Sequence, residues 1–320
     1  MRFAFTDEQL EFRAAVRDLL ARECPTDVVR SAWTNDDGRA PRAWAALAEM
    51  GVLSLMVPEA DGGYGLSEVD LVLLVEETGR VALPEPIVET ALVAAPAGWV
   101  AGTASAAVVM PESPVAVWAD SADVVVALAA DGVRVHPRSS LALAERASVD
   151  GSRRLFEVTA PDAATVAPVA TAALAFRRGV LGTAAQLLGL TDRMIELTVA
   201  YVEQREQFGV KIGTFQAVKH HLADARTRLE FARPLVYRAA ASLATSDPAA
   251  TSHVGMAKVQ AGDAANLAGR VALQCHGAIG YTTEYDLHLF MKRAWALSAA
   301  WGDAAWHRRM LARTLLDQRA

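Results

Sequence analysis

The sequence has few cysteines, no marked excess of one charge and no long hydrophobic run. Its two cysteines, Cys24 and Cys275, form no metal-binding or redox pattern, which favours a reducing compartment. A net charge of −6 gives no general basic surface for nucleic acid. Apolar stretches are interrupted well before the ~18 residues that a membrane span needs, and the N-terminus carries no signal-peptide pattern. These absences predict a cytoplasmic protein that binds neither nucleic acid nor membrane.

The 320 residues suffice for a large core and for roughly two average domains. Apolar residues make up 52% of the chain and charged residues 21%, proportions typical of a globular protein. Three regions are predicted from the change of pattern along the chain. They are an N-terminal helical domain over residues 1–104, a shortened β domain over 105–168 and a C-terminal helical bundle over 169–320.

Local signals support this division. Thr6, followed three residues later by Gln9, forms a capping-box pattern that starts a helix. In the second region Asp131 and Gly132 lie between two valine-rich runs and indicate a hairpin. The third region carries two apolar stripes at helical spacing, which predict the core of a bundle. The stripes are Leu187, Leu190, Met194, Leu197 and Tyr201, and Leu222, Ala225, Leu229, Ala232 and Val236.

Two segments of the third region carry residues that suit a dinucleotide. One is R-E-Q-F-G-V-K-I-G-T-F-Q, residues 205–216, and the other is Q-C-H-G-A-I-G-Y, residues 274–281. A dinucleotide needs an anion site, an apolar wall and room for close approach of the backbone. Arg205 offers a fixed donor fork for phosphate oxygens, and Phe208 offers an apolar face. The glycines of the second segment allow the backbone to approach closely.

In this order and at this spacing, the two segments resemble the FAD-binding motifs of the acyl-CoA dehydrogenase family. F-T-D-E-Q-L-E-F-R, from residue 5, resembles the opening helix of that family. M-G-V-L-S-L-M-V-P-E-A-D-G-G-Y-G-L-S, from residue 50, resembles its Gly-rich loop. The resemblance covers nearly the whole chain. It implies a mostly α fold with a small β region: an N-terminal helical domain, a truncated middle β domain and a C-terminal four-helix bundle.

In that family the two motifs reach across a dimer and hold the ADP half of the FAD bound by the neighbouring subunit. The resemblance therefore implies FAD as the cofactor. It assigns FAD binding to Arg205, Gln207, Phe208, Phe215, Gln216, Gln274, Cys275, His276, Gly277 and Ala278. Ala278 stands where the family carries glycine, so the fit there is expected to be looser.

The family reaction is α,β-dehydrogenation of an acyl-CoA thioester, in which a carboxylate removes the α proton. Most members place it in a Glu-Gly-Thr segment, and the resemblance puts Trp301 and Gly302 there. Other members place it near the start of the first bundle helix, but no Glu occurs between Glu157 and Glu196. Asp303 is the nearest carboxylate, yet two residues along a helix turn a side chain by ~200°. We therefore expect no catalytic residue on this chain.

The segments that contact the flavin ring in the family are also altered. Met110-Pro111-Glu112-Ser113 is the nearest counterpart of the family's Thr-Glu-Pro segment and lacks the threonine. Ala305 stands where the family often has a polar flavin contact. The base, the ring segment and the β domain belong to one half of a composite site, whereas the half that serves a neighbour is retained.

This one-sided loss resembles the short non-catalytic subunits of heteromeric actinobacterial acyl-CoA dehydrogenases of sterol side-chain degradation, which form α2β2 tetramers. The resemblance implies a full-length partner subunit that carries the catalytic Glu and most of the acyl-CoA site. It also implies electron-transfer flavoprotein or a similar electron acceptor. Two alternatives stay open: a self-sufficient dehydrogenase with a displaced base, and a non-enzymatic structural or binding relative.

His220, His221 and Asp224 form the one grouping that invites a metal interpretation. Adjacent residues on a helix point about 100° apart. At most one of the two histidines can therefore join Asp224 on the same face. We expect polar bundle or interface residues here and no metal site.

Overall fold

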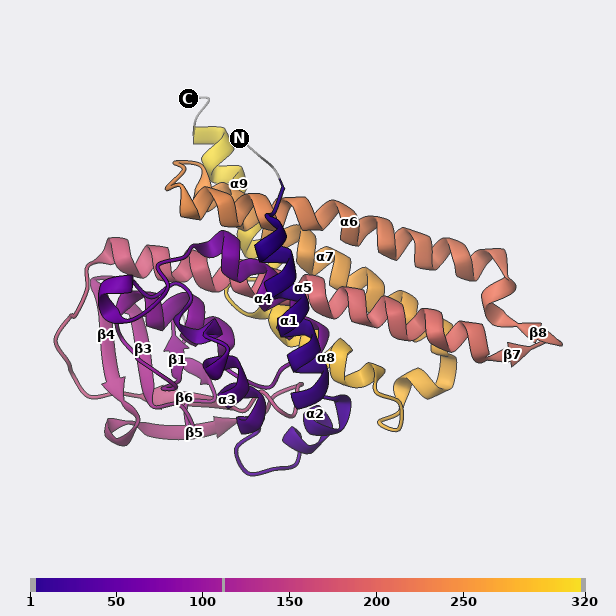
Figure 1. The fold of residues 1–320 in the computed structure, drawn as a ribbon, viewed down its shortest axis with the longest axis horizontal. Coiled ribbons are helices and arrows are strands. Elements are labelled where there is room, and N and C mark those ends of the chain that lie inside the picture. The colour runs from indigo at the N-terminus through magenta and orange to yellow at the C-terminus, as the bar shows by residue number, and fades with distance from the viewer. Residues whose placement is uncertain (1–3, 111–112, 318–320) are drawn as a thin grey trace.

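The computed structural model describes residues 4–110 and 113–317 and is dominated by helices (Figure 1). Helices α1 to α4 come first, two small sheets follow, and helices α5 to α9 complete the chain. In Figure 1 the sheets lie at one end of the long axis, and the tips of the long helices lie at the other. The two FAD-motif segments therefore belong to the end that is remote from the sheets.

The N-terminal part begins with the helix predicted from its cap. Thr6 and Gln9 form a capping box at the start of α1, which confirms that pattern. A second capping box, formed by Ser67 and Asp70, starts α4. The helical elements of this part are α1 (Asp7–Glu23), α2 (Thr26–Ala32), α3 (Pro41–Glu49), η1 (Val52–Ser54), η2 (Glu59–Asp61), α4 (Glu68–Arg80), the π-helix η3 (Val88–Ala94) and η4 (Ala95–Ala97).

Two three-stranded sheets make up the β region. One has the order β1-β3-β4 with β1 and β3 parallel, and the other has the antiparallel order β2-β6-β5. Ala129 pairs with Gly132, so Ala130 and Asp131 form the loop of the predicted hairpin. The valine-rich runs predict neither β1 nor β5, and β5 is largely exposed and lacks an apolar alternation. The bounds are β1 (Ala106–Val109), β2 (Val115–Val117), β3 (Val124–Ala129), β4 (Gly132–Pro137), η5 (Arg138–Ser140), β5 (Ala142–Arg146) and β6 (Leu155–Thr159).

Long helices form the C-terminal part. Helix α5 has 36 residues and lies beside α6 and α7 along the long axis (Figure 1). Leu187 and Met194 of α5 are fully buried, as is Leu229 of α6, which confirms the two apolar stripes as core. The bounds are α5 (Val169–Gln204), β7 (Glu206–Gln207), β8 (Val210–Lys211), η6 (Ile212–Thr214), α6 (Gln216–Ala244), α7 (Ala250–His276), η7 (Gly277–Tyr281), α8 (Leu287–Ala299) and α9 (Ala304–Asp317).

The predicted domain boundaries, at residues 104/105 and 168/169, stay predictions. A bilayer-spanning helix needs length and apolar character together. Within the described part of the chain, no helix combines the two well enough to cross a membrane.

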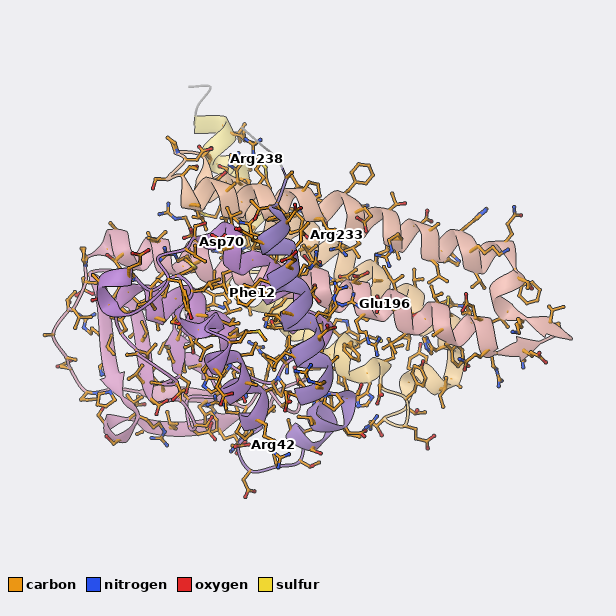
Figure 2. The ribbon with its side chains drawn as sticks, viewed as in Figure 1. Phe12, Arg42, Asp70, Glu196, Arg233 and Arg238 are labelled. Carbon is orange, nitrogen blue, oxygen red and sulfur yellow. The ribbon has the colours of Figure 1, made fainter. Side chains whose placement is uncertain are left out.

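Charged side chains join the N-terminal helices to the bundle (Figure 2). Glu76 of α4 is fully buried and accepts a hydrogen bond of 2.7 Å from the Tyr237 hydroxyl. The same carboxylate pairs with Arg13 of α1 and Arg233 of α6. Arg233 also reaches Asp192 of α5, at 3.1 Å. Because a buried charge is strongly destabilising when one partner is removed, these pairs hold α1 and α4 in place against the bundle.

Candidate functional site

The first FAD-motif segment forms a hairpin at the end of α5. Strands β7 and β8 are joined by a two-residue loop, Phe208 and Gly209, with φ values of +55° and +77°. Positive φ at both positions is the requirement of the type I′ hairpin turn. The turn places Phe208 in the loop at the tip of the hairpin, where 94% of the residue is exposed. A phenylalanine this exposed is available to a ligand or a partner chain.

The polar groups of this hairpin also face outward. Arg205 is exposed, and its guanidinium has no hydrogen bond or ion pair with any residue of the described ranges. Its backbone carbonyl accepts from Ile212 N–H at 2.9 Å, so the main chain at this point is held firmly. Among the described residues, the exposed Gln207 side chain donates only to the neighbouring carbonyl of Glu206. Within the described residues, the Arg205 guanidinium is therefore unpaired while its main chain is anchored.

Phe215 and Gln216 complete the first segment. The Phe215 ring meets Phe208 edge-on, with ring centroids 6.3 Å apart. Gln216 is the first residue of α6 and is exposed, so its amide lies where the free backbone N–H groups of that helix begin. The N-terminus of a helix favours an anion, so this end of α6 suits a negatively charged group.

The second segment ends α7 and continues into η7. Gln274, Gly277 and Ala278 are exposed, and Cys275 is half-buried. Gly277 has a φ of +63° with open space where a side chain would stand, so its backbone lies bare at the surface. We keep the FAD-binding assignment of these residues as a prediction.

His276 links the two segments. Its ring stacks on Tyr201, four residues before Arg205, with centroids 4.3 Å apart and planes inclined by 24°. The Tyr201 hydroxyl also donates to the His276 carbonyl at 3.4 Å. The ends of α5 and α7 are thereby joined, although the two segments lie far apart in the sequence.

The His276 ring leaves one buried acceptor unused. Nδ1 donates to the Ala272 carbonyl at 2.7 Å, which makes Nε2 the acceptor of the neutral ring. Burial lowers the pKa of His276, so the ring stays neutral at pH 7. Nε2 is buried and has no partner among the described residues. Because buried polar atoms are normally hydrogen-bonded, a donor from a bound group suits this position.

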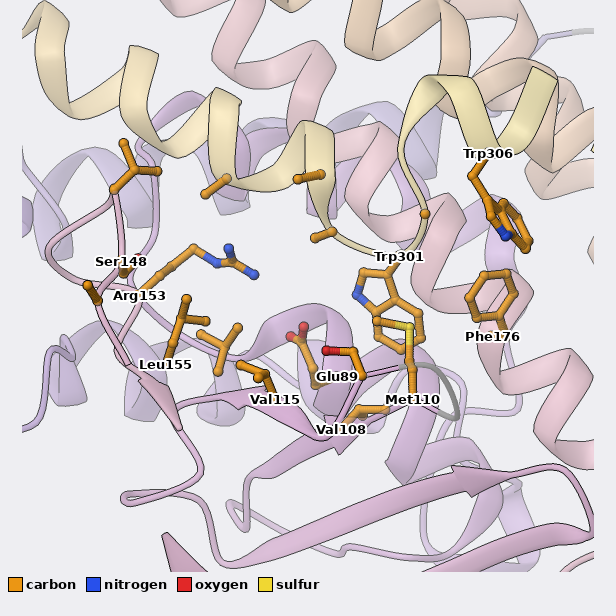
Figure 3. Close-up of a pocket in the computed structure, with 18 residues that line it drawn as sticks. Glu89, Val108, Met110, Val115, Ser148, Arg153, Leu155, Phe176, Trp301 and Trp306 are labelled. Carbon is orange, nitrogen blue, oxygen red and sulfur yellow. The ribbon is translucent and has the colours of Figure 1, made fainter. Parts of the chain in front are cut away.

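A separate cavity of about 520 Å³ lies around Trp301 (Figure 3). Its walls come from η3, the edges of both sheets, α5, α8 and the turn after α8. Most of the lining is aliphatic or aromatic, including Val115, Leu155 and Phe176, whereas Glu89 and Arg153 are its charged members. Met110 and Ser113 line it as well, but the Pro111 and Glu112 of the predicted ring segment lie outside the described residues.

Trp301 fills the space beside α5. Its side chain is buried, and its backbone adopts a φ of +57° in the turn between α8 and α9. The ring lies against Gly179 of α5, where an added Cβ would be 2.4 Å from the indole. Gly179 belongs to the stretch in which other family members are expected to place the catalytic Glu. Trp301, at one expected place of the base, therefore contacts the stretch of α5 that holds the base in other members.

Buried polar groups hold this turn. Lys258 of α7 donates from Nζ to the carbonyls of Ser298 and Gly302, each at 3.0 Å. Burial lowers the pKa of Lys258 to about 7. His307 Nε2 lies 3.0 Å from the Trp301 carbonyl, and burial lowers the pKa of His307 to about 4. The main chain at Trp301 is thus fixed from both α7 and α9.

Asp303 lies outside the cavity. It is exposed and accepts a hydrogen bond of 2.7 Å from the backbone N–H of Trp306, which makes it a cap of α9. His220, His221 and Asp224 are exposed on α6. Among the described residues, no group of three or more His, Cys, Asp or Glu side chains is placed to hold a metal ion.

Sequence reasoning missed Glu89. This carboxylate belongs to the π-helix η3 and lies beside Trp301 in the cavity (Figure 3). Burial raises the pKa of Glu89, while the charge of Arg153 and the side chain of Trp301 oppose that shift. A single acid in the apolar run P-I-V-E-T-A-L-V-A was the available signal. Position 89 is neither of the two places that the family resemblance indicates for the base.

Comparison with known proteins assigns the chain to a family. Residues 6–106 match the model of the acyl-CoA dehydrogenase N-terminal domain, and residues 167–316 match that of the C-terminal domain. Acyl-CoA dehydrogenase IpdE2 of Mycolicibacterium smegmatis is 32% identical over 304 residues, covering 90% of this chain and 93% of that protein. The chain therefore belongs to the acyl-CoA dehydrogenase family.

Solved structures show the same fold. A chain of the steroid ACAD variant Tcur3481-Tcur3483 has a TM-score of 0.87 at 23% identity and covers 98% of this chain and 99% of its own length. A chain of the ChsE4-ChsE5 complex from Mycobacterium tuberculosis has a TM-score of 0.86 at 21% identity, with 99% of both chains covered. The predicted architecture of N-terminal helices, small β region and C-terminal helices is thus confirmed.

Proposed function

We propose that this chain is the non-catalytic subunit of a heteromeric, flavin-dependent acyl-CoA dehydrogenase. In this proposal a full-length partner subunit supplies the catalytic Glu, the flavin-ring pocket and most of the acyl-CoA site. This chain supplies the contacts to the ADP half of the partner's FAD. The complex is an α2β2 tetramer that passes electrons to electron-transfer flavoprotein or a similar acceptor.

The observation that carries the proposal is the outward presentation of the first segment. Arg205 and Phe208 project from the end of the bundle, and 94% of Phe208 is exposed. A cofactor held by the chain's own cavity around Trp301 has no contact with this hairpin, because no hairpin residue lines that cavity. A neighbouring chain is the natural source of the ligand.

The residues present fit the ADP half of FAD. Arg205 would neutralise phosphate, Phe208 and Phe215 would cover an apolar face, and Gln216 would supply an amide. His276 Nε2 would accept the hydrogen bond that it lacks within the described chain. FAD, when bound, supplies the acceptor for the β hydrogen of the substrate. The work of this chain is to bind and orient that cofactor.

The relatives support a steroid-related thioester as substrate. IpdE2 is named an acyl-CoA dehydrogenase, and two similar structures are titled a steroid ACAD variant and a complex of two different chains. We infer for this chain the same kind of heteromeric assembly and a role in steroid degradation. Both inferences go beyond the family assignment.

The test is the flavin content of the purified complex. Co-expression with a full-length dehydrogenase encoded beside it should yield a yellow tetramer with one FAD per heterodimer, measured by flavin absorbance against protein concentration. The chain purified alone should retain little flavin. Two FAD per heterodimer would contradict the proposal, since this chain would then hold a complete ring pocket.

Glu89 supports a second candidate function. A partly buried carboxylate with a raised pKa, in an apolar cavity next to the expected site of the base, has the features of a general base. In this candidate the chain is a self-sufficient dehydrogenase, and Glu89 is its displaced base. It predicts stoichiometric FAD on the chain purified alone, which separates it from the first proposal.

A further inference from the structure

Arg153 is a buried cation that has no hydrogen-bonded or ion-pair partner among the described residues. It lies in the turn before β6, and only 6% of the residue is exposed. Its side chain runs into the cavity around Trp301 (Figure 3). Within residues 4–110 and 113–317, its guanidinium has no hydrogen bond or ion pair. Burial of an arginine without a hydrogen-bonded partner is costly, because the charge loses its water and only the fields of Glu89 and Asp150 offset that loss.

The neighbouring Arg293 shows what the fold provides for a structural arginine. Arg293 is equally buried, and it pairs with Asp150. It also donates to Ser152 Oγ and to the Leu83 carbonyl, each at 2.7 Å. The same region of the chain therefore gives every nitrogen of one guanidinium a hydrogen-bond acceptor and directs the other guanidinium into the cavity.

The cavity walls restrict what Arg153 can bind. Around the guanidinium the lining is mainly aliphatic, as at Val115 and Leu155, and the volume of about 520 Å³ lies within the range of small-molecule sites. Among the described lining residues Glu89 is the other charged group, and its field disfavours a second negative charge. A monoanion with an apolar body matches the single charge of Arg153 and the aliphatic walls around it. A dianionic phosphate does not.

We propose that this cavity binds an apolar monocarboxylate, with the carboxylate on the Arg153 guanidinium and the apolar body against the aliphatic wall. The planar guanidinium fork matches the two carboxylate oxygens. The neutral carbonyl of a thioester would leave the guanidinium without a hydrogen-bonded anion. The site is distinct from the surface of Arg205 and His276, and it does not depend on the place of the partner's FAD.

Calorimetric titration of the purified full-length chain with octanoate and with octan-1-ol tests the proposal. Octanoate should bind one equivalent per chain, at least tenfold more tightly than the alcohol. Its binding should also change the fluorescence of Trp301 and Trp306, which line the cavity. Equal affinities, absence of saturable octanoate binding, or preferential binding of pyrophosphate would overturn it.

Two variants test whether Arg153 makes the contact with octanoate. Arg153→Met should weaken octanoate binding roughly ten- to hundredfold, which is the loss of a charge-assisted hydrogen bond, and leave octan-1-ol binding within about twofold. Arg146→Met, at an exposed arginine of β5 paired with Glu157, is the matched control and should leave octanoate binding unchanged.

The melting temperature separates a binding arginine from a purely structural one, because replacement of a structural arginine would lower it. Without ligand, Arg153→Met should melt at a higher temperature than the wild type, because an unpaired buried charge has been removed. Added octanoate should raise the melting temperature of the wild type and not that of the variant. A variant that melts lower or fails to fold would make Arg153 a structural residue and would refute the proposal.

Discussion

The indole of Trp301 lies so close to Gly179 that a single methyl group on the glycine would be 2.4 Å from the ring. Two positions far apart in the sequence have thus become complementary in volume. The resemblance places a catalytic Glu at position 301 in most members, and near the start of the first bundle helix, which includes Gly179, in others. The tryptophan fills the space beside α5, and the absence of a side chain on α5 makes that space available.

This contact predicts that Gly179→Ala has opposite effects on stability in the wild type and in a Trp301→Ala background. Gly179→Ala should destabilise the wild type by about 1–3 kcal/mol, since overpacking forces the indole to move. In a Trp301→Ala background the same substitution should stabilise by about 0.5–1 kcal/mol, because alanine favours a helix interior over glycine. Urea unfolding measures both. Gly262→Ala in α7, where the nearest atom is 3.9 Å away, is the control and should not destabilise.

Removal of the Arg205 side chain should weaken FAD retention by the complex. Arg205→Ala loses a charge-assisted phosphate contact worth about 1.5–3 kcal/mol, or roughly a ten- to hundredfold change in affinity. The amount of flavin released from the complex during gel filtration measures this loss of affinity. Arg42→Ala, at an exposed arginine on α3 that Figure 2 shows away from the hairpin, should retain flavin like the wild type. Equal retention by both variants in an intact complex would make Arg205 dispensable.

Glu89→Gln distinguishes the two candidate functions. If the partner carries the base, turnover by the complex should stay within a few fold of the wild type. Loss of a true base costs several kcal/mol of barrier, and each 1.36 kcal/mol is a factor of ten in rate. Steady-state rates at matched FAD content provide the measurement.

The matched control for that experiment is Asp303→Asn, at the exposed cap of α9. It should leave turnover within a few fold under either function. A drop beyond about a thousandfold in Glu89→Gln alone, with FAD bound, would establish the self-sufficient enzyme. The same drop in Asp303→Asn would contradict both proposals.

His307 predicts a loss of stability in mild acid. Its pKa is about 4 in the folded chain, and 6.5 is the ordinary value, so the unfolded chain binds more protons between these pH values. Stability should therefore fall as the pH drops from 6.5 towards 4. The contribution of this one group at pH 4.5 is about 2 kcal/mol.

Comparison of the wild type with His307→Gln isolates that contribution. Glutamine keeps a donor for the Trp301 carbonyl and does not titrate. Between pH 7 and pH 4.5 the wild type should lose about 2 kcal/mol more unfolding free energy than the variant. Parallel pH profiles of the two proteins would show that His307 is not responsible.

Much of the fold was predictable because its signals are local. The capping box of Thr6 and Gln9, the hairpin beside Asp131 and the stripe through Leu187 and Met194 each depend on residues within a few positions of one another. Helical and strand periodicity report such neighbours directly. Strand β5 escaped prediction because, with most of its residues exposed, no apolar alternation marks it.

The sequence by itself determined the types of residue available for the site. The FAD-motif segments, the tryptophan at position 301 and the lone acid of the η3 run can all be read from it. Only the tertiary structure decided which residues meet: His276 on Tyr201, Trp301 on Gly179, and Arg153 facing an apolar cavity without a partner. The physical reason is that helical and strand patterns specify the face of one element. The packing of several elements sets the distances between faces, and no local pattern encodes those distances.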